Sequence, residues 1–168
     1  MKKEIRKVFF KRRDGLTPTK HAEIEQKMIA QFLKAINLLL SKDCQPPLLP
    51  NTQREVVVGS FYSVRSEIKA QSILDQLMEQ GTHFNGKKLI CSLPAVESMK
   101  ESTMKFRRYE GVDGLVRSKL GIMEPKPEND ALEPDILVAP LCCYDLSLNR
   151  IGFGSGFFDK YIEELRSK

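Results

Sequence analysis

The segment Gly152-Phe153-Gly154-Ser155-Gly156-Phe157-Phe158-Asp159, near the end of the 168-residue chain, decides its fold class. An apolar run at 136–139 precedes it, and apolar side chains with helical periodicity follow, at Phe157, Phe158, Tyr161, Ile162 and Leu165. The sequence therefore predicts a strand, a glycine-rich loop and a helix in succession. Such an arrangement brings unsatisfied backbone N–H groups to the positive end of a helix dipole, where phosphate is attracted.

The glycine spacing in this loop matches neither the dinucleotide fingerprint nor a P-loop. Two interpretations are therefore open for Gly152, Gly154 and Gly156. They form either a phosphate cradle, which an anion approaches without a Cβ in the way, or a tight turn between strand and helix. Asp159 is equally open, because an acid in the first helical turn either holds a magnesium ion that bridges phosphate oxygens or only favours the helix dipole.

The composition is that of a globular protein, with 41% hydrophobic and 29% charged residues. No apolar run approaches the roughly 20 residues that span a bilayer, and the N-terminus lacks the apolar core of a signal peptide. The four cysteines, Cys44, Cys91, Cys142 and Cys143, have no metal-type spacing and are interpreted as reduced thiols. We therefore expect a cytoplasmic, monomeric protein without a membrane partner.

The positive charge is concentrated at the N-terminus. Of a net charge of +5, residues 1–13 carry seven basic side chains against only Glu4, so the remainder is nearly neutral. A nucleic-acid module built on this basic segment is therefore disfavoured, and we expect no nucleic-acid partner. In the helix predicted here, three basic residues line up beside an apolar stripe: Lys2, Arg6 and Arg13. They either point into a cleft toward an anion or form a solvated face.

Strands and helices alternate along the rest of the chain. Thr17-Pro18 begins a long amphipathic helix, and a proline-rich connection follows at 43–52. We predict strands at 55–62, 87–93 and 103–109 and a helix from Ser63 to Gly81. The chain is thus expected to form one α/β domain over residues 1–168, with N-terminal helices at about 2–40 and a core at about 54–168. The prediction is a three-layer domain with a mostly parallel central sheet and helices on both faces.

The C-terminal motifs resemble the signature of 5-formyltetrahydrofolate cyclo-ligases, also called methenyltetrahydrofolate synthetases. The resemblance rests on Asp-Ile-Leu-Val-Ala-Pro at 135–140, Tyr144-Asp145, and the run from Asn149 to Lys160. This chain departs from the family pattern at four positions: Leu141 stands for glycine, Phe157 and Phe158 for two tyrosines, and Lys160 for arginine. Weaker similarities lie at 2–6 (Lys-Lys-Glu-Ile-Arg), 61–67, Leu93-Pro94, Met104-x-Phe106 and 121–125. We interpret Glu124-Pro125 in the last of these as a loop-shaping element.

The resemblance implies an activity. It is the ATP-dependent conversion of 5-formyltetrahydrofolate to 5,10-methenyltetrahydrofolate, in which the γ-phosphoryl group passes to the formyl oxygen and ADP and phosphate are released. Such chemistry needs positioning and charge neutralisation more than a protein nucleophile. His21 and His83 are accordingly poor general-base candidates. The cofactors implied are ATP and Mg²⁺, and the partners are small molecules.

The resemblance also implies site residues. The nucleotide-binding set is Lys2, Arg6, Arg150, Gly152, Phe153, Gly154, Ser155, Gly156 and Phe157. The substrate-binding set is Tyr62, Glu67, Met104 and Phe158, where Glu67 pairs with the 2-amino-4-oxo edge of the pterin. Without the resemblance, Glu67 reads as an acid near a helix N-terminus. Arg150 and Asp159 are the catalytic candidates, and Asp159 is also the metal ligand.

Members of this family continue past the last helix into a further strand and an acidic segment. This chain stops at Lys168. The alternative expectation is therefore a shortened, catalytically impaired homologue that binds folate or nucleotide without turnover.

Overall fold

The protein is described from a computed structural model, in which residues 1–41, 55–81 and 83–167 are placed. The proline-rich connection expected at 43–52, and with it Cys44, lies outside the described residues. The helices are α1 (Lys2–Asp14), α2 (Pro18–Leu39), α3 (Gln71–Glu79) and α4 (Phe157–Arg166), with a short 3₁₀ helix at Val112–Gly114. The strands are β1 (Glu55–Gly59), β2 (His83–Phe84), β3 (Lys87–Ser98), β4 (Thr103–Arg108), β5 (Leu115–Arg117), β6 (Met123–Pro125), β7 (Ala131–Leu132), β8 (Ile136–Leu137), β9 (Cys143–Tyr144) and β10 (Arg150–Ile151).

The central sheet is mixed, so the expectation of a mostly parallel sheet was wrong. Its order is β7-β4-β3-β1-β8, with β2 also paired to β3. β1 is parallel to β3 and β8, whereas β3–β4, β4–β7 and β2–β3 are antiparallel. The physical reason is the length of the connection after β3. Only a short turn at 99–102 separates β3 from β4, and such a turn joins antiparallel neighbours, whereas a parallel pair needs a long crossover.

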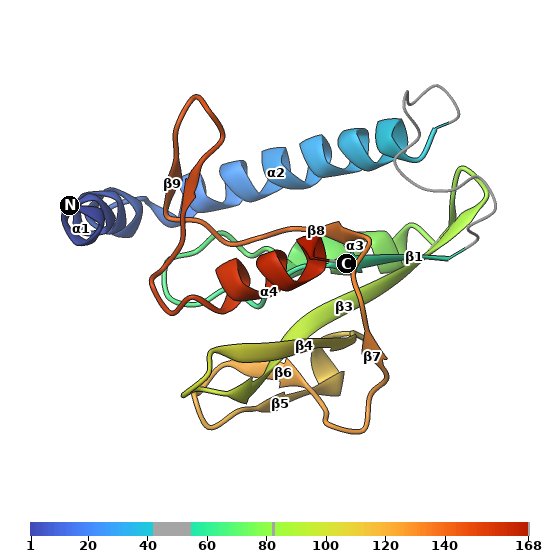
Figure 1. Ribbon diagram of the computed structural model, residues 1–168. Helices are drawn as coiled ribbons and strands as arrows, with labels where there is room; N and C mark the ends of the chain where they lie inside the picture. Colours follow the sequence, from blue (N-terminus) through green and yellow to red (C-terminus); the bar gives the residue numbers. More distant parts are fainter. Residues whose placement is uncertain (42–54, 82, 168) are drawn as a thin grey trace.

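Helices cover both faces of this sheet, which confirms the expected α/β layering (Figure 1). On one face, α2 and α3 pack through Ile36, Ile73 and Leu77 against the inward side chains of β1 and β3. On the other face, the ring of Phe106 from β4 lies 6.2 Å from Phe158 and 5.0 Å from Tyr161 of α4. The alternation of side chains along each strand supplies both cores.

One predicted helix boundary shifts, for an identifiable reason. The helix expected from Ser63 begins only at Gln71, because the Ser63 hydroxyl accepts a hydrogen bond from the Ala70 N–H (2.7 Å) and donates one to the Ile68 carbonyl (2.6 Å). These bonds close a loop that competes with helix formation. The start of α2 is confirmed, since the Thr17 hydroxyl accepts from the Lys20 N–H at 3.2 Å.

None of the described helices is long and apolar enough to cross a membrane.

Gly59 is the position where β1 tolerates no side chain. A Cβ there would lie 2.7 Å from Pro134 Cγ and 2.9 Å from Phe106 Cε1, both in rigid rings. We predict that Gly59→Ala lowers the free energy of unfolding by about 1–3 kcal/mol, because overpacking forces neighbouring side chains and backbone apart. Urea titration followed by circular dichroism measures this change.

Gly114→Ala is the matched control for that substitution. Its Cβ would meet nothing closer than Glu110 Cβ at 3.9 Å, so its stability should stay within about 0.5 kcal/mol of the wild type. Equal stabilities for the two variants would contradict the described packing of β1 against Phe106.

Candidate active site

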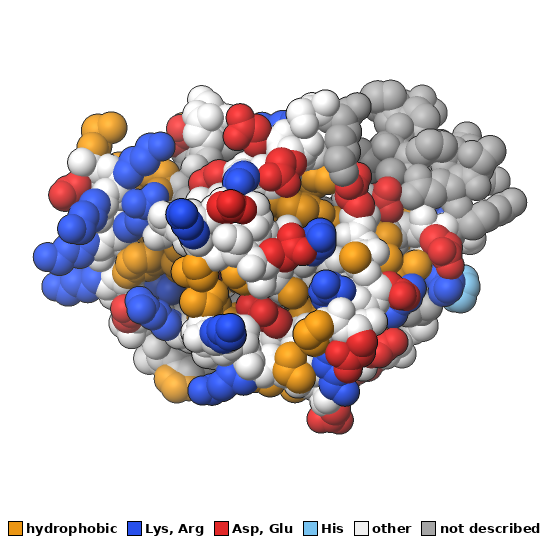
Figure 2. Space-filling view, turned by 60° about the horizontal axis from the view of Figure 1, so that its bottom comes forward, with side chains coloured by type: hydrophobic (Ala, Val, Ile, Leu, Met, Phe, Trp, Pro, Cys, Tyr) orange, Lys and Arg blue, Asp and Glu red, His pale blue; other side chains and the backbone are white. Residues whose placement is uncertain are grey.

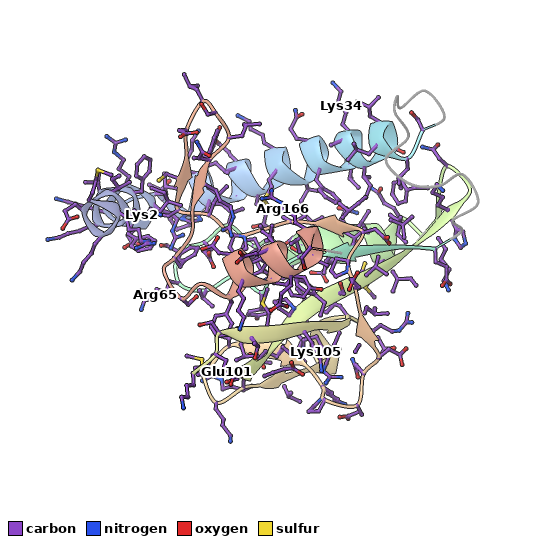
Figure 3. All side chains as sticks on the ribbon, in the orientation of Figure 1. Lys2, Lys34, Arg65, Glu101, Lys105 and Arg166 are labelled. Carbon is purple, nitrogen blue, oxygen red and sulfur yellow. The ribbon has the colours of Figure 1, made fainter. Side chains whose placement is uncertain are left out.

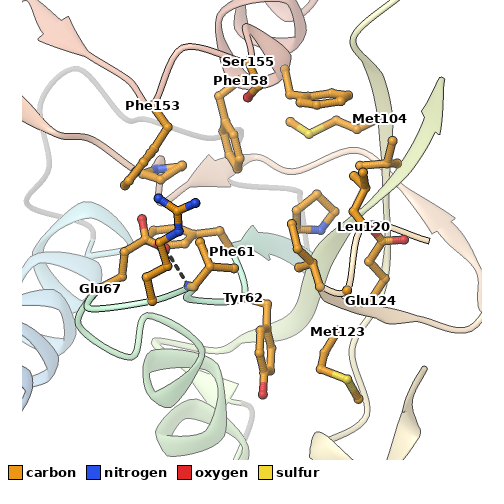
Figure 4. A pocket seen from close by; sticks show the side chains of 18 of the residues that line it. Phe61, Tyr62, Glu67, Met104, Leu120, Met123, Glu124, Phe153, Ser155 and Phe158 are labelled. Carbon is orange, nitrogen blue, oxygen red and sulfur yellow. Dashed lines mark hydrogen bonds between the residues drawn. The ribbon is translucent and has the colours of Figure 1, made fainter. Parts of the chain in front are cut away.

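A cavity of about 630 Å³ lies beyond the carboxyl ends of the parallel strands β1 and β8. Its size is in the usual range for small-molecule sites. The loop after β1 contributes Phe61 and Tyr62, and Pro140 follows β8. Helix α1, strands β3 and β4, the segment 120–124 and the glycine loop complete the wall (Figure 4). This is the position where ligands bind in open α/β sheets.

The four residues expected to bind the folate all line this cavity. They are Tyr62, Glu67, Met104 and Phe158. The Phe158 ring stands edge-on to Phe61, with centroids 6.4 Å apart, so the two rings form an apolar wall on the glycine-loop side. The structure thus brings together residues that are separated by up to 96 positions in the sequence.

Glu67 is a buried carboxylate of this cavity, with 7% of its side chain exposed. One oxygen, Oε2, accepts a hydrogen bond from the Val64 N–H at 2.7 Å, and Oε1 lies 3.9 Å from Arg13 Nη1. Burial raises the pKa of the Glu67 carboxyl, and the Val64 N–H and the Arg13 charge oppose that rise. The carboxylate therefore has one oxygen held by the backbone and the other near a cation at the cavity wall.

The glycine loop is in contact with helix α1 from the opposite end of the chain. Arg6 Nε donates a hydrogen bond to the Gly152 carbonyl at 2.7 Å, and a Cβ on Gly154 would lie 3.3 Å from Arg6 Cζ. Gly154 and Gly156 have positive φ angles of 111° and 80°, which favour glycine. The expected meeting of Arg6 with the glycine loop is therefore observed, beside the N-terminus of α4.

Arg150 and Asp159, the catalytic candidates, pair with each other beside this loop. Arg150 Nη2 lies 2.5 Å from Asp159 Oδ1, and Nη1 donates to the Pro140 carbonyl at 2.8 Å. Asp159 remains open to solvent, with 68% of its side chain exposed, whereas Arg150 is 19% exposed. The described residues contain no group of three or more His, Cys, Asp or Glu side chains that would hold a metal ion. Asp159 can nevertheless supply one hard oxygen, and Mg²⁺ often takes one or two carboxylates and completes its shell with phosphate and water.

A second, basic hollow of about 950 Å³ runs along α1 next to the apolar cavity, and the two share Phe10 and Phe153. Arg6 lines the hollow together with a row of lysines at Lys3, Lys7 and Lys11. Lys and Arg side chains gather at the end of the molecule formed by α1 (Figure 2). Lys2, which was expected to contact phosphate, is on the same helix (Figure 3) but is not among the residues that line the hollow. The spacing of the lysines, i, i+4 and i+8, is the sequence signal that identifies this face.

Three charged residues that line the apolar cavity, Arg13, Arg65 and Glu124, were not assigned to the site from the sequence. The Arg13 guanidinium lies 5.2 Å from the centres of both the Phe10 and Phe153 rings. Glu124 on β6 is 8% exposed and lines the wall opposite Glu67. Burial raises the pKa of the Glu124 carboxyl, opposed by the Ser118 hydroxyl and the Val96 backbone. Glu124 therefore lines the site from a strand, whereas the sequence interpretation gave it only a loop-shaping part.

Comparison with known proteins identifies the family of the chain. The model of the 5-formyltetrahydrofolate cyclo-ligase family matches residues 1–168. The 5-formyltetrahydrofolate cyclo-ligase of Escherichia coli K12 is 26% identical over 156 residues, covering 90% of this chain and 74% of the relative. The Haemophilus influenzae protein of the same name is 25% identical over 169 residues, covering 98% of this chain and 77% of the relative.

Two solved structures share the fold. The NMR structure of Aquifex aeolicus 5,10-methenyltetrahydrofolate synthetase has a TM-score of 0.67 at 22% identity, covering 96% of this chain and 72% of that one. The Mycoplasma pneumoniae 5,10-methenyltetrahydrofolate synthetase has a TM-score of 0.61 at 18% identity, covering 97% of this chain and 77% of that one. On its sequence and its fold, the chain belongs to the 5-formyltetrahydrofolate cyclo-ligase family.

Proposed function

We propose that this protein catalyses the ATP-dependent cyclisation of 5-formyltetrahydrofolate to 5,10-methenyltetrahydrofolate, with release of ADP and phosphate. The main observation behind the proposal is that the apolar cavity and the glycine loop lie side by side. An apolar cavity with a fixed, buried carboxylate, Glu67, adjoins a glycine loop that is in contact with Arg6 and flanked by Arg150. The membership of the family, whose other members are named as cyclo-ligases, supports the same conclusion.

The cavity suits the pterin end of the folate. A carboxylate accepts two parallel N–H bonds from a 2-amino-4-oxo heterocycle, and Glu67 is a buried carboxylate between aromatic and aliphatic walls. Phe158 and Met104 offer apolar surface to the ring system. Phe158 has no hydroxyl, so its part is packing and the exclusion of water.

The reaction requires a better leaving group than the formyl oxygen. That oxygen attacks the γ-phosphorus of ATP, the bond to ADP breaks, and an activated phosphoryl ester of the formyl group remains. The amine at position 10 then attacks the activated carbon, its proton is released, and the carbon–oxygen bond breaks as phosphate departs. Arg6 and Arg150 would neutralise the developing charge, and the backbone amides at 152–157 would hold the phosphoryl oxygens.

Asp159 is the side chain that we assign to a magnesium ion. When bound, Mg²⁺ supplies charge neutralisation across the nucleotide phosphates. In the structure Asp159 is bonded to Arg150, so each holds the other beside the glycine loop. Nucleotide phosphates would compete for Arg150 and free the Asp159 carboxylate.

We further propose that the chain acts as a single cyclo-ligase domain, as a monomer in the cytoplasm, on small-molecule partners and without nucleic acid. The confinement of the positive patch to α1, next to the site, supports small anionic ligands over an extended polyanion.

The direct test of the proposed function is an absorbance assay. With 5-formyltetrahydrofolate, ATP and Mg²⁺ together, we predict growth of the methenyl product's band, and no growth when ATP is left out. Stabilisation by ligand in a thermal melt without product would instead identify a binding-only homologue. The absence of both product and thermal stabilisation would contradict the proposal.

Glu67→Gln should separate function from stability. The folded-state pKa of Glu67 is raised above an unfolded value near 4.3, so wild-type stability falls as the pH rises through the window between those two values. Glu67→Gln lacks this titration. The free energy of unfolding of Glu67→Gln should therefore exceed that of the wild type at pH 7, and this difference should shrink toward pH 4. The folate affinity of the variant should fall roughly 10- to 100-fold, because a charge-assisted pair with the ligand is lost.

Urea titrations across pH and calorimetric folate titrations measure the two effects of Glu67→Gln. The exposed Glu163→Gln on α4 is the control and should change neither quantity. Unaltered folate affinity in Glu67→Gln would remove Glu67 from the site.

Gly154→Ala tests the glycine loop. Besides straining a backbone with a φ of 111°, the added methyl would press on the Arg6 guanidinium, so we predict a loss of affinity for a non-hydrolysable ATP analogue of about tenfold or more. Gly86→Ala has a comparable φ of 76° and open space around it. It should lose similar stability with nucleotide affinity intact, and equal affinities in the two variants would argue against nucleotide binding at this loop.

A further inference from the structure

Arg13 lies where the apolar cavity and the glycine loop meet. Its guanidinium is 5.2 Å from the centre of the Phe153 ring and 5.2 Å from the centre of the Phe10 ring. In the sequence, Phe153 lies between Gly152 and Gly154 of the glycine loop. On the folate side, Arg13 Nη1 is 3.9 Å from Glu67 Oε1. Only 19% of the Arg13 side chain is exposed. One guanidinium is thus in contact with the loop expected to bind ATP and with the carboxylate expected to bind folate.

The guanidinium is held in one orientation. Its Nε donates a hydrogen bond to the Ser66 hydroxyl at 3.1 Å, and that hydroxyl in turn donates to the Asp14 carboxylate. The Phe10 and Phe153 rings are stacked at 5.4 Å with an interplanar angle of 20°. A planar guanidinium gains from both aromatic faces and from directed hydrogen bonds, which a lysine ammonium at this position would not reproduce.

Helix α1 carries both Arg13 and Arg6, so it links the Arg13 contacts to the glycine loop that is expected to bind phosphate. Arg6 and Arg13 are seven residues apart, about two helical turns, so they point from the same face of α1. Arg6 contacts the Gly152 carbonyl and Arg13 contacts the Phe153 ring. A change in the glycine loop therefore reaches Arg13 by two routes: directly through Phe153, and through the position of the helix.

Building on the proposed function, we propose that Arg13 is a positioning residue through which nucleotide binding at the glycine loop and folate binding at Glu67 strengthen each other. A phosphate on the loop restricts Phe153, the restricted ring fixes the Arg13 guanidinium, and the fixed guanidinium holds Glu67 Oε1 in the orientation that a pterin needs. The first ligand orders groups that the second would otherwise have to order, so the second binds more tightly. Because such coupling is reciprocal, folate also tightens the nucleotide by the same factor.

The experiment is a calorimetric titration of 5-formyltetrahydrofolate with and without saturating Mg²⁺ and a non-hydrolysable ATP analogue. In the wild type we expect the analogue to tighten folate binding about fivefold or more. In Arg13→Gln this factor should fall to near one. Arg13→Lys keeps the charge near Glu67 but loses the flat face against Phe153, so it should restore only part of the factor.

Arg12→Gln is the matched control. Arg12 is the neighbouring cation, exposed, and packs 5.5 Å from the Phe9 ring, so its loss should leave the wild-type factor intact. Phe153→Leu removes the ring from the other end of the contact and should also lower the factor. It carries the test if Arg13→Gln does not fold, as judged by circular dichroism.

A wild-type factor near one, or an unchanged factor in folded Arg13→Gln or Phe153→Leu, would overturn the inference. These outcomes are distinguishable from failure of the proposed function, which shows separately, as the absence of the methenyl product in the absorbance assay or of any folate binding by the wild-type protein.

Discussion

The site depends on one long-range contact, the docking of the first helix onto the glycine loop near the other end of the chain. α1 has no fully buried residue and carries the concentrated positive charge, so polar bonds and ring stacking contribute to holding it in place. Its contacts with the rest of the protein include the Arg6 bond to the Gly152 carbonyl at 2.7 Å, the stack of Phe10 on Phe153 at 5.4 Å, and the bonds of Arg13 and Asp14 to the Ser66 hydroxyl. The same contact brings cations beside the loop. One interaction therefore both anchors the helix and forms the anion-binding end of the site.

The rest of the site follows from how the sheet places its loops. β1 and β8 run parallel and deliver Phe61, Tyr62 and Pro140 to one edge, and α4 starts from the glycine loop at the same edge. The reaction needs no protein nucleophile, which agrees with a site whose notable groups are the buried carboxylates Glu67 and Glu124 and cations beside a set of backbone amides. Burial raises the pKa of Glu67 and so opposes its ionisation. A buried carboxylate that lowers stability in this way is expected where its role is to bind a ligand.

Much of this arrangement could be predicted from the sequence, and the remainder depended on contacts that no local pattern encodes. Helical periodicity identified α2 and α4, and the glycine loop with Arg6 and Glu67 followed from motif resemblance. The mixed sheet was missed because a short turn at 99–102 reverses the chain where a crossover was expected. The late start of α3 depends on the hydroxyl of Ser63, and the place of Glu124 depends on tertiary packing. Lys2 was predicted from the motif and from its helical alignment with Arg6, whereas the row of Lys3, Lys7 and Lys11 that lines the basic hollow was not predicted.

The measurement that bears most directly on this account is a structure of the protein with Mg²⁺ and a non-hydrolysable ATP analogue. The account predicts that the terminal phosphates lie over the backbone amides at 152–157, within hydrogen-bond distance of Arg6, with α1 in its described position. A triphosphate bound elsewhere, with the Arg6 bond to the Gly152 carbonyl unchanged and the loop free of ligand, would contradict it.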